Sequence, residues 1–168
     1  MAPPRVSALI VSYNTREVLL EAVGSVAGEA SVETIVFDNA SHDGSPEAVA
    51  RRFPVVHLIR SAANLGFAAG VNRAAACARG DALLVLNSDA RLLPGALDQL
   101  TSLLEKKPSA ALVSPALVYP DGRHQAAAFR FPGLAQVALD LFPVPRLTDT
   151  PLNGRVQSRE PAPIDHPL

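Results

Sequence analysis

The feature that most restricts the fold of this chain is a short apolar run, Ala82 to Leu86, which leads directly into the polar residues Asn87 and Asp89. Such a run is too short to cross a bilayer, and it predicts a strand that is covered on both faces of a sheet. Open α/β sheets bind their ligands at the carboxyl ends of such strands, and Asp89 offers the hard oxygen donor that Mg²⁺ or Mn²⁺ prefers. The alternative is that Asn87 and Asp89 only form a turn and cap the next helix, which we expect near Leu92.

The same succession of apolar run, polar loop and amphipathic segment recurs along most of the chain. We expect strands over residues 6–11, 33–37, 55–59, 82–86 and 110–118. We expect helices over residues 16–26, 46–53, 64–78 and 94–106, and the leucines of the last helix should face a core. Strands and helices that alternate in this way predict an α/β fold, a three-layer αβα sandwich around a mostly parallel sheet.

The regularity fades after Arg123. Residues 129–132 predict a short strand and residues 134–142 a short amphipathic helix, whereas residues 143–168 contain six prolines and no clear periodicity. We therefore predict one domain over residues 1–132. Over residues 133–168 we predict a short helix followed by an irregular, poorly ordered, proline-rich tail.

Composition argues against several classes of protein. The net charge is −1 with acidic and basic residues interspersed, so the chain lacks the electrostatic footprint of a nucleic-acid-binding protein. Cys77 is the only cysteine and lies in an alanine-rich helical pattern, which indicates a structural, buried thiol. Because the chain has neither a cysteine framework nor a signal-peptide pattern, we expect a cytoplasmic protein. Peripheral contact with the inner face of the membrane stays open.

Four motifs of the chain resemble, in order and spacing, the nucleotide-binding half of family 2 glycosyltransferases, which are inverting enzymes with the GT-A fold. The motifs are Ile10-Val-Ser-Tyr-Asn14, Val36-Phe-Asp-Asn-Ala-Ser-His-Asp-Gly-Ser45, Asn64-Leu-Gly-Phe67 with Asn72, and Leu86-Asn-Ser-Asp-Ala90. A further segment resembles the rhamnosyltransferase-like branch of this family. It consists of the turn Tyr119-Pro-Asp-Gly122 followed by Gln125, Arg130, Phe131 and Pro132.

The resemblance implies a nucleotide site built from four segments. Its members are Ser12, Tyr13, Asn14, Asp38, Asn64, Gly66, Asn72, Asn87 and Asp89. Asp38 matches the carboxylate that accepts the imide N–H of uracil or thymine. Asp89 matches the last residue of the Asp-x-Asp metal motif, whose first aspartate is replaced here by Asn87, and it would ligate Mg²⁺ or Mn²⁺. For Asn72, which lies inside a predicted helix, the alternative is a structural hydrogen bond to a nearby loop.

The resemblance also implies an activity. The chain would transfer a sugar, with rhamnose favoured, from a UDP- or dTDP-sugar to a glycan or lipid-linked acceptor with inversion. A divalent ion would stabilise the leaving diphosphate, and a carboxylate would take the proton of the acceptor hydroxyl. In the family that base follows a further strand. Among the downstream carboxylates Asp165 is the best placed, although its surroundings do not match. We therefore expect the chain to stop short of the catalytic base.

Two other functions fit parts of the same pattern. A degenerate or truncated pocket would make a non-catalytic module that only binds a sugar nucleotide. A sugar nucleotidyltransferase shares the sheet plan, but it needs a glycine-rich, basic phosphate loop after the first strand, where this chain has Ser12-Tyr-Asn-Thr15. The binding module stays open from the residues alone, whereas the nucleotidyltransferase is disfavoured.

Overall fold

The structure is a computed structural model that describes residues 6–125, 137–138 and 141–142. The chain divides into two compact units, Met1–Ala111 and Leu112–Leu168. Of the predicted helix over 134–142, the described residues Val137, Ala138 and Leu141 are helical. The predicted strand at 129–132, the boundary after residue 132 and the tail with Asp165 lie outside the described residues. Within the described part, no helix has the length and hydropathy that a membrane crossing requires.

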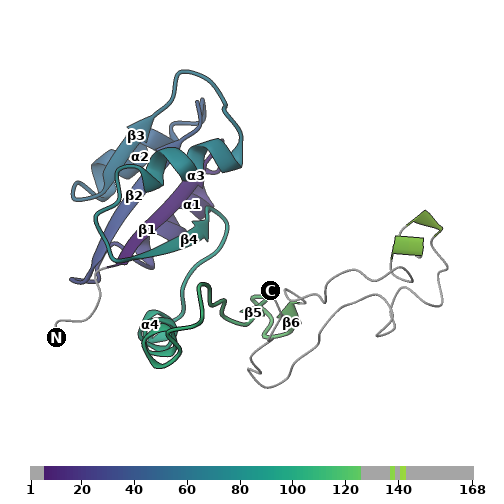
Figure 1. The fold of residues 1–168 in the computed structure, drawn as a ribbon. Helices are drawn as coiled ribbons and strands as arrows, with labels where there is room; N and C mark the ends of the chain where they lie inside the picture. The colour runs from purple at the N-terminus through teal and green to yellow at the C-terminus, as the bar shows by residue number, and fades with distance from the viewer. Residues whose placement is uncertain (1–5, 126–136, 139–140, 143–168) are drawn as a thin grey trace. The chain divides into compact units, whose positions relative to one another are not determined.

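The first unit contains a parallel sheet with the strand order β3-β2-β1-β4. The strands are β1 (Val6–Ser12), β2 (Val32–Asp38), β3 (His57–Arg60) and β4 (Ala82–Asn87). The helices are α1 (Arg16–Gly24), α2 (Ser45–Arg52), α3 (Phe67–Ala75) and α4 (Ala96–Lys106). Helices α1 and α2 pack on one face of the sheet and α3 packs on the other (Figure 1). The predicted αβα sandwich with a parallel sheet is therefore confirmed.

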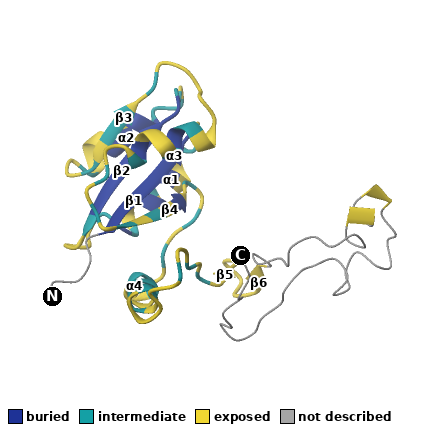
Figure 2. Cartoon of the chain, in the orientation of Figure 1, coloured by how far each residue is buried: buried dark blue, intermediate teal, exposed yellow. Residues whose placement is uncertain are grey.

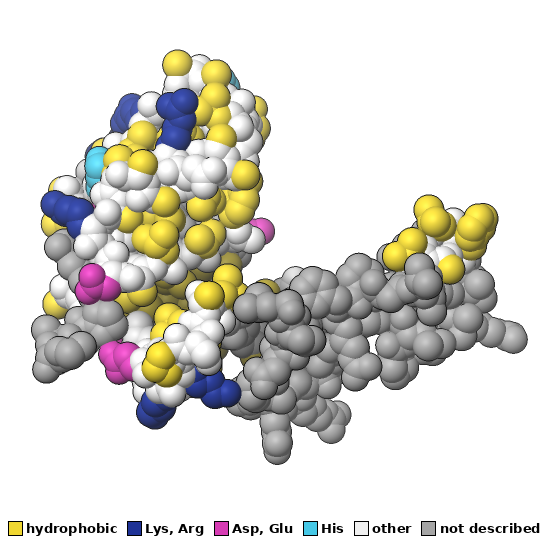
Figure 3. All heavy atoms as spheres, viewed as in Figure 1, with side chains coloured by type: hydrophobic (Ala, Val, Ile, Leu, Met, Phe, Trp, Pro, Cys, Tyr) yellow, Lys and Arg dark blue, Asp and Glu magenta, His cyan; other side chains and the backbone are white. Residues whose placement is uncertain are grey.

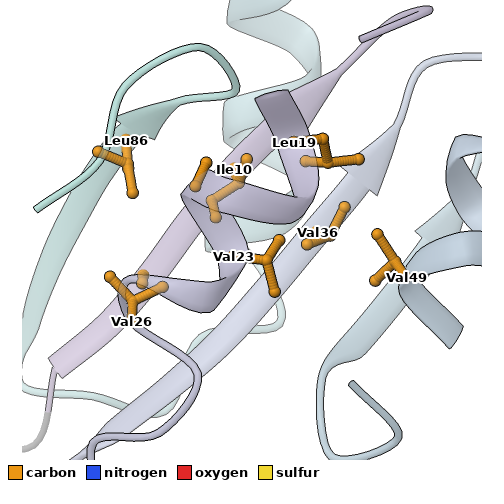
Figure 4. Close-up of a cluster of buried hydrophobic side chains, with 9 residues drawn as sticks. Ile10, Leu19, Val23, Val26, Val36, Val49 and Leu86 are labelled. Atoms are coloured by element: carbon orange, nitrogen blue, oxygen red, sulfur yellow. The ribbon is translucent and has the colours of Figure 1, made fainter. Parts of the chain in front are cut away.

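Apolar cores on both faces hold the sheet. On the face of α1 and α2, Ile10 and Val36 of the strands meet Leu19 and Val23 of α1 and Val49 of α2 (Figure 4). On the opposite face, Ala74 of α3 packs with four strand residues: Leu9, Val11, Ile35 and Phe37. Cys77, which follows α3, is exposed, so the prediction of a buried thiol is wrong. Successive residues of β1 and β2 point alternately to these two cores, and this explains why both strands are continuously apolar at their centres.

The close packing of α3 on the sheet depends on Gly70. A Cβ atom at this position would lie 2.9 Å from Cγ1 of Val11 and 3.1 Å from Cδ1 of Phe37. Because real side chains do not tolerate such contacts, glycine lets α3 approach β1 and β2 more closely than any other residue would. This approach keeps the loop that precedes α3 near the carboxyl ends of the strands.

β4 is less covered than we predicted. It is an edge strand, and Leu83 and Val85, which point to the side of α3, are 53% and 49% exposed. β1 and β2 are buried along nearly their whole length (Figure 2), whereas hydrophobic side chains reach the surface over β4 (Figure 3). The prediction that both faces of this strand are covered is wrong, because α3 covers β1 and β2 but, within the described residues, not β4.

The leucine face of α4 also differs from the prediction. None of the described α4 residues is buried, and Leu103 is 43% exposed. No other described helix or strand packs closely against α4. The helix itself is confirmed, but the prediction that its leucines face a core is wrong for the described part of the chain.

The second unit contains a short hairpin. β5 (Leu117–Val118) pairs with β6 (His124–Gln125) in antiparallel orientation. The N–H of Gly122 donates to the carbonyl of Tyr119 at 2.8 Å, and the positive φ of 83° at Gly122 suits the predicted turn. The predicted strand over 110–118 is wrong except for its last two residues. Pro115 cannot donate to a ladder, and residues 110–116 have no strand partner among the described residues.

Candidate functional site

The strand register brings the predicted site residues to one edge of the sheet. Ser12 at the end of β1 is opposite Asp38 at the end of β2, and Asn87 at the end of β4 pairs with Val11. Asp38 in turn is opposite Arg60 at the end of β3. Because all four strands are parallel, their carboxyl ends form a single rim, where α/β sheets bind ligands.

Asp38 is the buried carboxylate of this rim. It is 3% exposed, and its Oδ2 accepts the backbone N–H of Ser41 at 3.1 Å. Its Oδ1 is also buried but has no hydrogen-bond partner in the described part of the chain. A buried, unpaired carboxylate oxygen is costly, so a donor supplied by a ligand would relieve an unfavourable arrangement.

The loops after β1 and β2 are joined by reciprocal hydrogen bonds. Oδ1 of Asn14 accepts the N–H of His42 at 2.8 Å, and the N–H of Asn14 donates to Oγ of Ser41 at 3.0 Å. Asn14 has a φ of +51° and Ala40 a φ of +66°, conformations that L-residues seldom adopt. The backbone at this rim is therefore held in a strained, well-defined shape, which is common at ligand sites.

Asp43 has a structural role in the loop after β2. Its Oδ1 accepts the N–H and the hydroxyl of Ser45, at 3.0 and 2.6 Å, at the start of α2. Its Oδ2 accepts the N–H of Arg16 at 2.9 Å. Burial raises the pKa of Asp43, but the hydrogen bonds from Ser45 and Arg16 outweigh this effect and the pKa lies below its ordinary value. Asp43 thus stays ionised and ties α1 to α2.

The loop between β3 and α3 is attached to residues 38 and 39. The N–H of Ser61 donates to the carbonyl of Asp38 at 2.9 Å, and the N–H of Leu65 donates to Oδ1 of Asn39 at 2.7 Å. Oδ1 of Asn64 accepts the N–H of Gly66 at 2.9 Å. We did not predict a role for Asn39. The signal available in the sequence was a polar residue directly after the last residue of a buried strand.

Three further residues of the predicted nucleotide site are exposed. Tyr13 is 48% exposed, and Asn64 and Asn72 are exposed as well. The side chain of Asn72 has no hydrogen bond to another described residue, so the alternative of a structural bond to a loop is not observed. Contact of these side chains with a nucleotide stays a prediction.

Asn87 and Asp89 do not cap the following helix. α4 begins at Ala96, its N-cap residue is Gly95, and no side chain caps it. The carbonyl of Asn87 accepts the N–H of Ala90 at 3.1 Å, which closes a turn through the backbone alone. The capping alternative is therefore wrong, and both side chains are exposed and free of hydrogen bonds to other described residues.

Asp89 is suited to share a divalent ion with a ligand. No cluster of three or more Asp, Glu, His or Cys side chains that could hold an ion occurs among the described residues. Mg²⁺ sites commonly use one or two carboxylates and complete their coordination with phosphate oxygens and water. An exposed carboxylate beside the exposed amide of Asn87 fits such a shared site.

Comparison with known proteins gives the family. The sequence profile described as glycosyl transferase family 2 matches residues 7–156. The N-acetylglucosaminyl-diphospho-decaprenol L-rhamnosyltransferase of Mycobacterium tuberculosis (strain CDC 1551 / Oshkosh) is 35% identical over 121 residues, which are 66% of this chain and 39% of the relative. The succinoglycan biosynthesis protein ExoO of Rhizobium meliloti (strain 1021) is 31% identical over 110 residues, 64% of this chain and 31% of the relative. The chain thus spans less than half the length of these relatives.

Solved structures agree with this result. TarS residues 1–349 of S. aureus, in complex with UDP-GlcNAc, superimposes with a TM-score of 0.56 at 21% identity, over 62% of this chain and 32% of that chain. The mannosyltransferase PcManGT from Pyrobaculum calidifontis, in complex with GDP-Man and Mn²⁺, has a TM-score of 0.55 at 26% identity, over 70% of this chain and 36% of that chain. The fold is the GT-A fold, and the predicted family is confirmed. The chain belongs to glycosyl transferase family 2.

Proposed function

We propose that this chain is the donor-binding part of a glycosyltransferase that uses a UDP- or dTDP-sugar, with rhamnose as the favoured sugar and a glycan or lipid-linked acceptor. The single observation that carries the proposal is the buried Asp38 with its unpartnered Oδ1 at the carboxyl rim of the sheet. The imide N–H of uracil or thymine can donate a hydrogen bond to this carboxylate oxygen. A guanine or cytosine base does not present the same single imide donor.

The rim offers separate places for the two halves of a nucleoside diphosphate. Asp38 lies at the end of β2, with Ser12 on the adjacent end of β1. Asn87 ends β4, on the other side of β1, and Asp89 follows two residues later. We assign the base to the side of Asp38 and the diphosphate to the side of Asp89.

Asp89, together with Asn87, would hold the divalent ion in this arrangement. A bound ion supplies Lewis-acid stabilisation of the charge that develops on the leaving diphosphate. Two comparisons support a divalent ion: the family to which the chain belongs, and the Mn²⁺ that is bound in the PcManGT complex. Mg²⁺ and Mn²⁺ are both suited to this donor set.

The second candidate is a module that binds a sugar nucleotide without transferring it. It is favoured because the other carboxylates at the rim are already engaged in structural contacts. Asp43 holds the start of α2, and Glu47 is paired with Arg60 at 2.7 Å. Asp38 is buried and is needed for the base. The proton acceptor for transfer would therefore come from outside these residues.

The proposal is tested by thermal denaturation of the chain with UDP, dTDP, GDP and their sugars, with and without Mn²⁺. A ligand that binds only the native state at a hundredfold excess over its Kd raises stability by about 2.7 kcal/mol, which a melting curve resolves. We expect UDP or dTDP to raise the melting temperature, GDP to do so less, and Mn²⁺ to enlarge the shift. Equal shifts for all bases, or none, would contradict the proposed donor site.

Transfer and binding without transfer are separated by a second assay. The chain is incubated with dTDP-rhamnose or UDP-sugar, Mn²⁺ and a polyprenyl-diphosphate-linked sugar, and release of the nucleoside diphosphate is followed. Binding together with release supports the transferase. Binding without release supports the second candidate.

A further inference from the structure

Helix α3 is held to the sheet by side-chain hydrogen bonds before and after it, one set at each edge of the sheet. Before the helix, Oδ1 of Asn39 accepts the N–H of Leu65 at 2.7 Å. After the helix, Oγ of Ser7 accepts the N–H of Gly80 at 2.9 Å. Asn39 is 3% exposed and Ser7 is fully buried, so the two ties are alike in chemistry and in burial.

We propose that Asn39 is a positioning residue of the donor site, which sets nucleotide affinity by fixing the loop of residues 61–66. This proposal rests on the proposed function. Asn39 binds Leu65 directly and thereby holds the two neighbours of Leu65 in the chain. These neighbours, Asn64 and Gly66, are predicted members of the nucleotide site.

The loop has little else to hold it. Residues 62–66 are all exposed, so no apolar core fixes their position. The loop is attached at its start, where the N–H of Ser61 donates to the carbonyl of Asp38. The bond from Leu65 to Asn39 attaches its end. Without that bond the described residues would hold the loop only through Ser61 and through its junction with α3, and the loop would have to be ordered when the nucleotide binds, at a cost in conformational entropy.

Asn39 is itself firmly placed. Its N–H donates to the carbonyl of Ser12 at 2.8 Å, which extends the β1–β2 ladder by one bond beyond the strands. Asn39 therefore joins the ends of β1 and β2 to the loop before α3. Ser7, by contrast, lies at the amino edge of the sheet, where none of the predicted nucleotide-site residues lies.

The experiment compares Asn39→Ala with Ser7→Ala in the full chain. UDP binding is measured by calorimetry well below the melting temperature of each variant. We expect both variants to lose stability, because each removes a buried side-chain acceptor that binds a backbone N–H. We expect Asn39→Ala to weaken UDP binding about tenfold, the equivalent of about 1.4 kcal/mol, and Ser7→Ala to bind UDP as the wild type does. Equal UDP affinity of Asn39→Ala and the wild type, or equal weakening in both variants, would overturn the proposal.

Amide hydrogen exchange at Leu65 provides a readout that stability alone does not move. In the wild type we expect the Leu65 N–H to be protected and to become more protected with UDP. In Asn39→Ala that protection should be lost, whereas in Ser7→Ala it should persist. A Leu65 amide that exchanges freely in the wild type, with and without UDP, would overturn the proposal even if Asn39→Ala does not fold.

The two proposals fail in different ways. If the wild type does not bind UDP or dTDP, the proposed function fails, whatever the state of the Leu65 amide. If the wild type binds UDP and Asn39→Ala binds it equally well, the proposed function stands and only the role of Asn39 fails.

Discussion

β2 carries a buried carboxylate near each end, and the surroundings of the two differ sharply. Glu33 near its start is 8% exposed and is fully paired, with Oε2 bound by the hydroxyl of Ser7 at 2.7 Å and Oε1 by Nε of Arg79 at 2.7 Å. Asp38 at its end is 3% exposed, and one of its two oxygens has no partner among the described residues. The carboxylate at the amino edge of the sheet therefore contributes to stability. At the carboxyl edge, one acceptor oxygen is free within the described part of the chain, and we propose that a ligand binds it.

The electrostatics of Glu33 support this contrast. Burial alone would raise its pKa, but the hydrogen bonds from Ser7 and Arg79 and the charge of Arg79 outweigh burial and lower the pKa to about 2. Glu33 is therefore ionised at neutral pH and has all the partners that a buried carboxylate needs. A ligand would find no free acceptor there.

The largest effect is expected for Asp38→Asn. The substitution keeps the shape of the side chain but replaces one acceptor oxygen with an amide donor, so UDP binding should weaken about a hundredfold, the equivalent of about 2.7 kcal/mol. The melting temperature should change little, because the amide oxygen can still accept the N–H of Ser41 and the replaced oxygen has no partner to lose among the described residues. Calorimetric titration and thermal melts measure both quantities. Unchanged UDP affinity, or a collapse of the fold, would contradict the proposed role of Asp38 in binding the base.

Glu33→Gln should show the opposite pattern. The substitution removes the charge that Arg79 faces and places an amide among hydrogen-bond donors, so the free energy of unfolding should fall by about 2 kcal/mol. UDP affinity should change by less than about twofold, since no predicted nucleotide contact lies at this edge. Denaturant unfolding and UDP titration of the same preparation test the claim. A loss of UDP affinity as large as in Asp38→Asn would contradict it.

A smaller effect is expected for Asp89→Ala. Mn²⁺ should strengthen UDP binding by about tenfold in the wild type, a gain equivalent to about 1.4 kcal/mol, and this gain should disappear in the variant. UDP affinity without metal should be the same in both proteins, because the base is bound at Asp38. UDP titrations with and without Mn²⁺ give the comparison. A full Mn²⁺ effect in Asp89→Ala would place the ion elsewhere.

The stability that Glu33 contributes should also depend on pH. Because the pKa of Glu33 falls from 4.5 to about 2 on folding, its contribution is present above pH 4.5 and is lost as the pH falls toward 2. The wild type should therefore lose its stability advantage over Glu33→Gln within this window. Urea unfolding of both proteins at neutral pH and at about pH 3 measures the difference. An advantage of the same size at both pH values would show that the ionised Glu33 is not the cause.

Local patterns in the sequence were enough to predict the sheet and the rim. The buried centres of β1 and β2 appear as continuous apolar runs, and the polar residues that follow them, such as Ser12 and Asp38, lie together because parallel strands end at one edge. The turn that ends at Gly122 was predictable because its positive φ favours glycine.

Local sequence patterns could not predict which helix covers each strand, or which distant residues form hydrogen bonds with one another. The apolar sequence of β4 indicates that the strand can be buried. Which helix covers the strand depends on the tertiary arrangement, and here Leu83 and Val85 are half-exposed. The bonds that join Ser7, Glu33 and Arg79 link three segments that are distant in the sequence. Nothing in the local pattern around any one of them indicates the other two.

The central claim is that Asp38 accepts a hydrogen bond from the pyrimidine base. Proton NMR of the chain saturated with ¹⁵N-labelled UDP measures this bond directly, because an imide proton is observed only when it is protected from exchange with water. We predict an imide resonance of bound UDP in the wild type and its absence in Asp38→Asn at a UDP concentration that saturates the variant. No imide resonance in the saturated wild type, or the same resonance in both proteins, would contradict the claim.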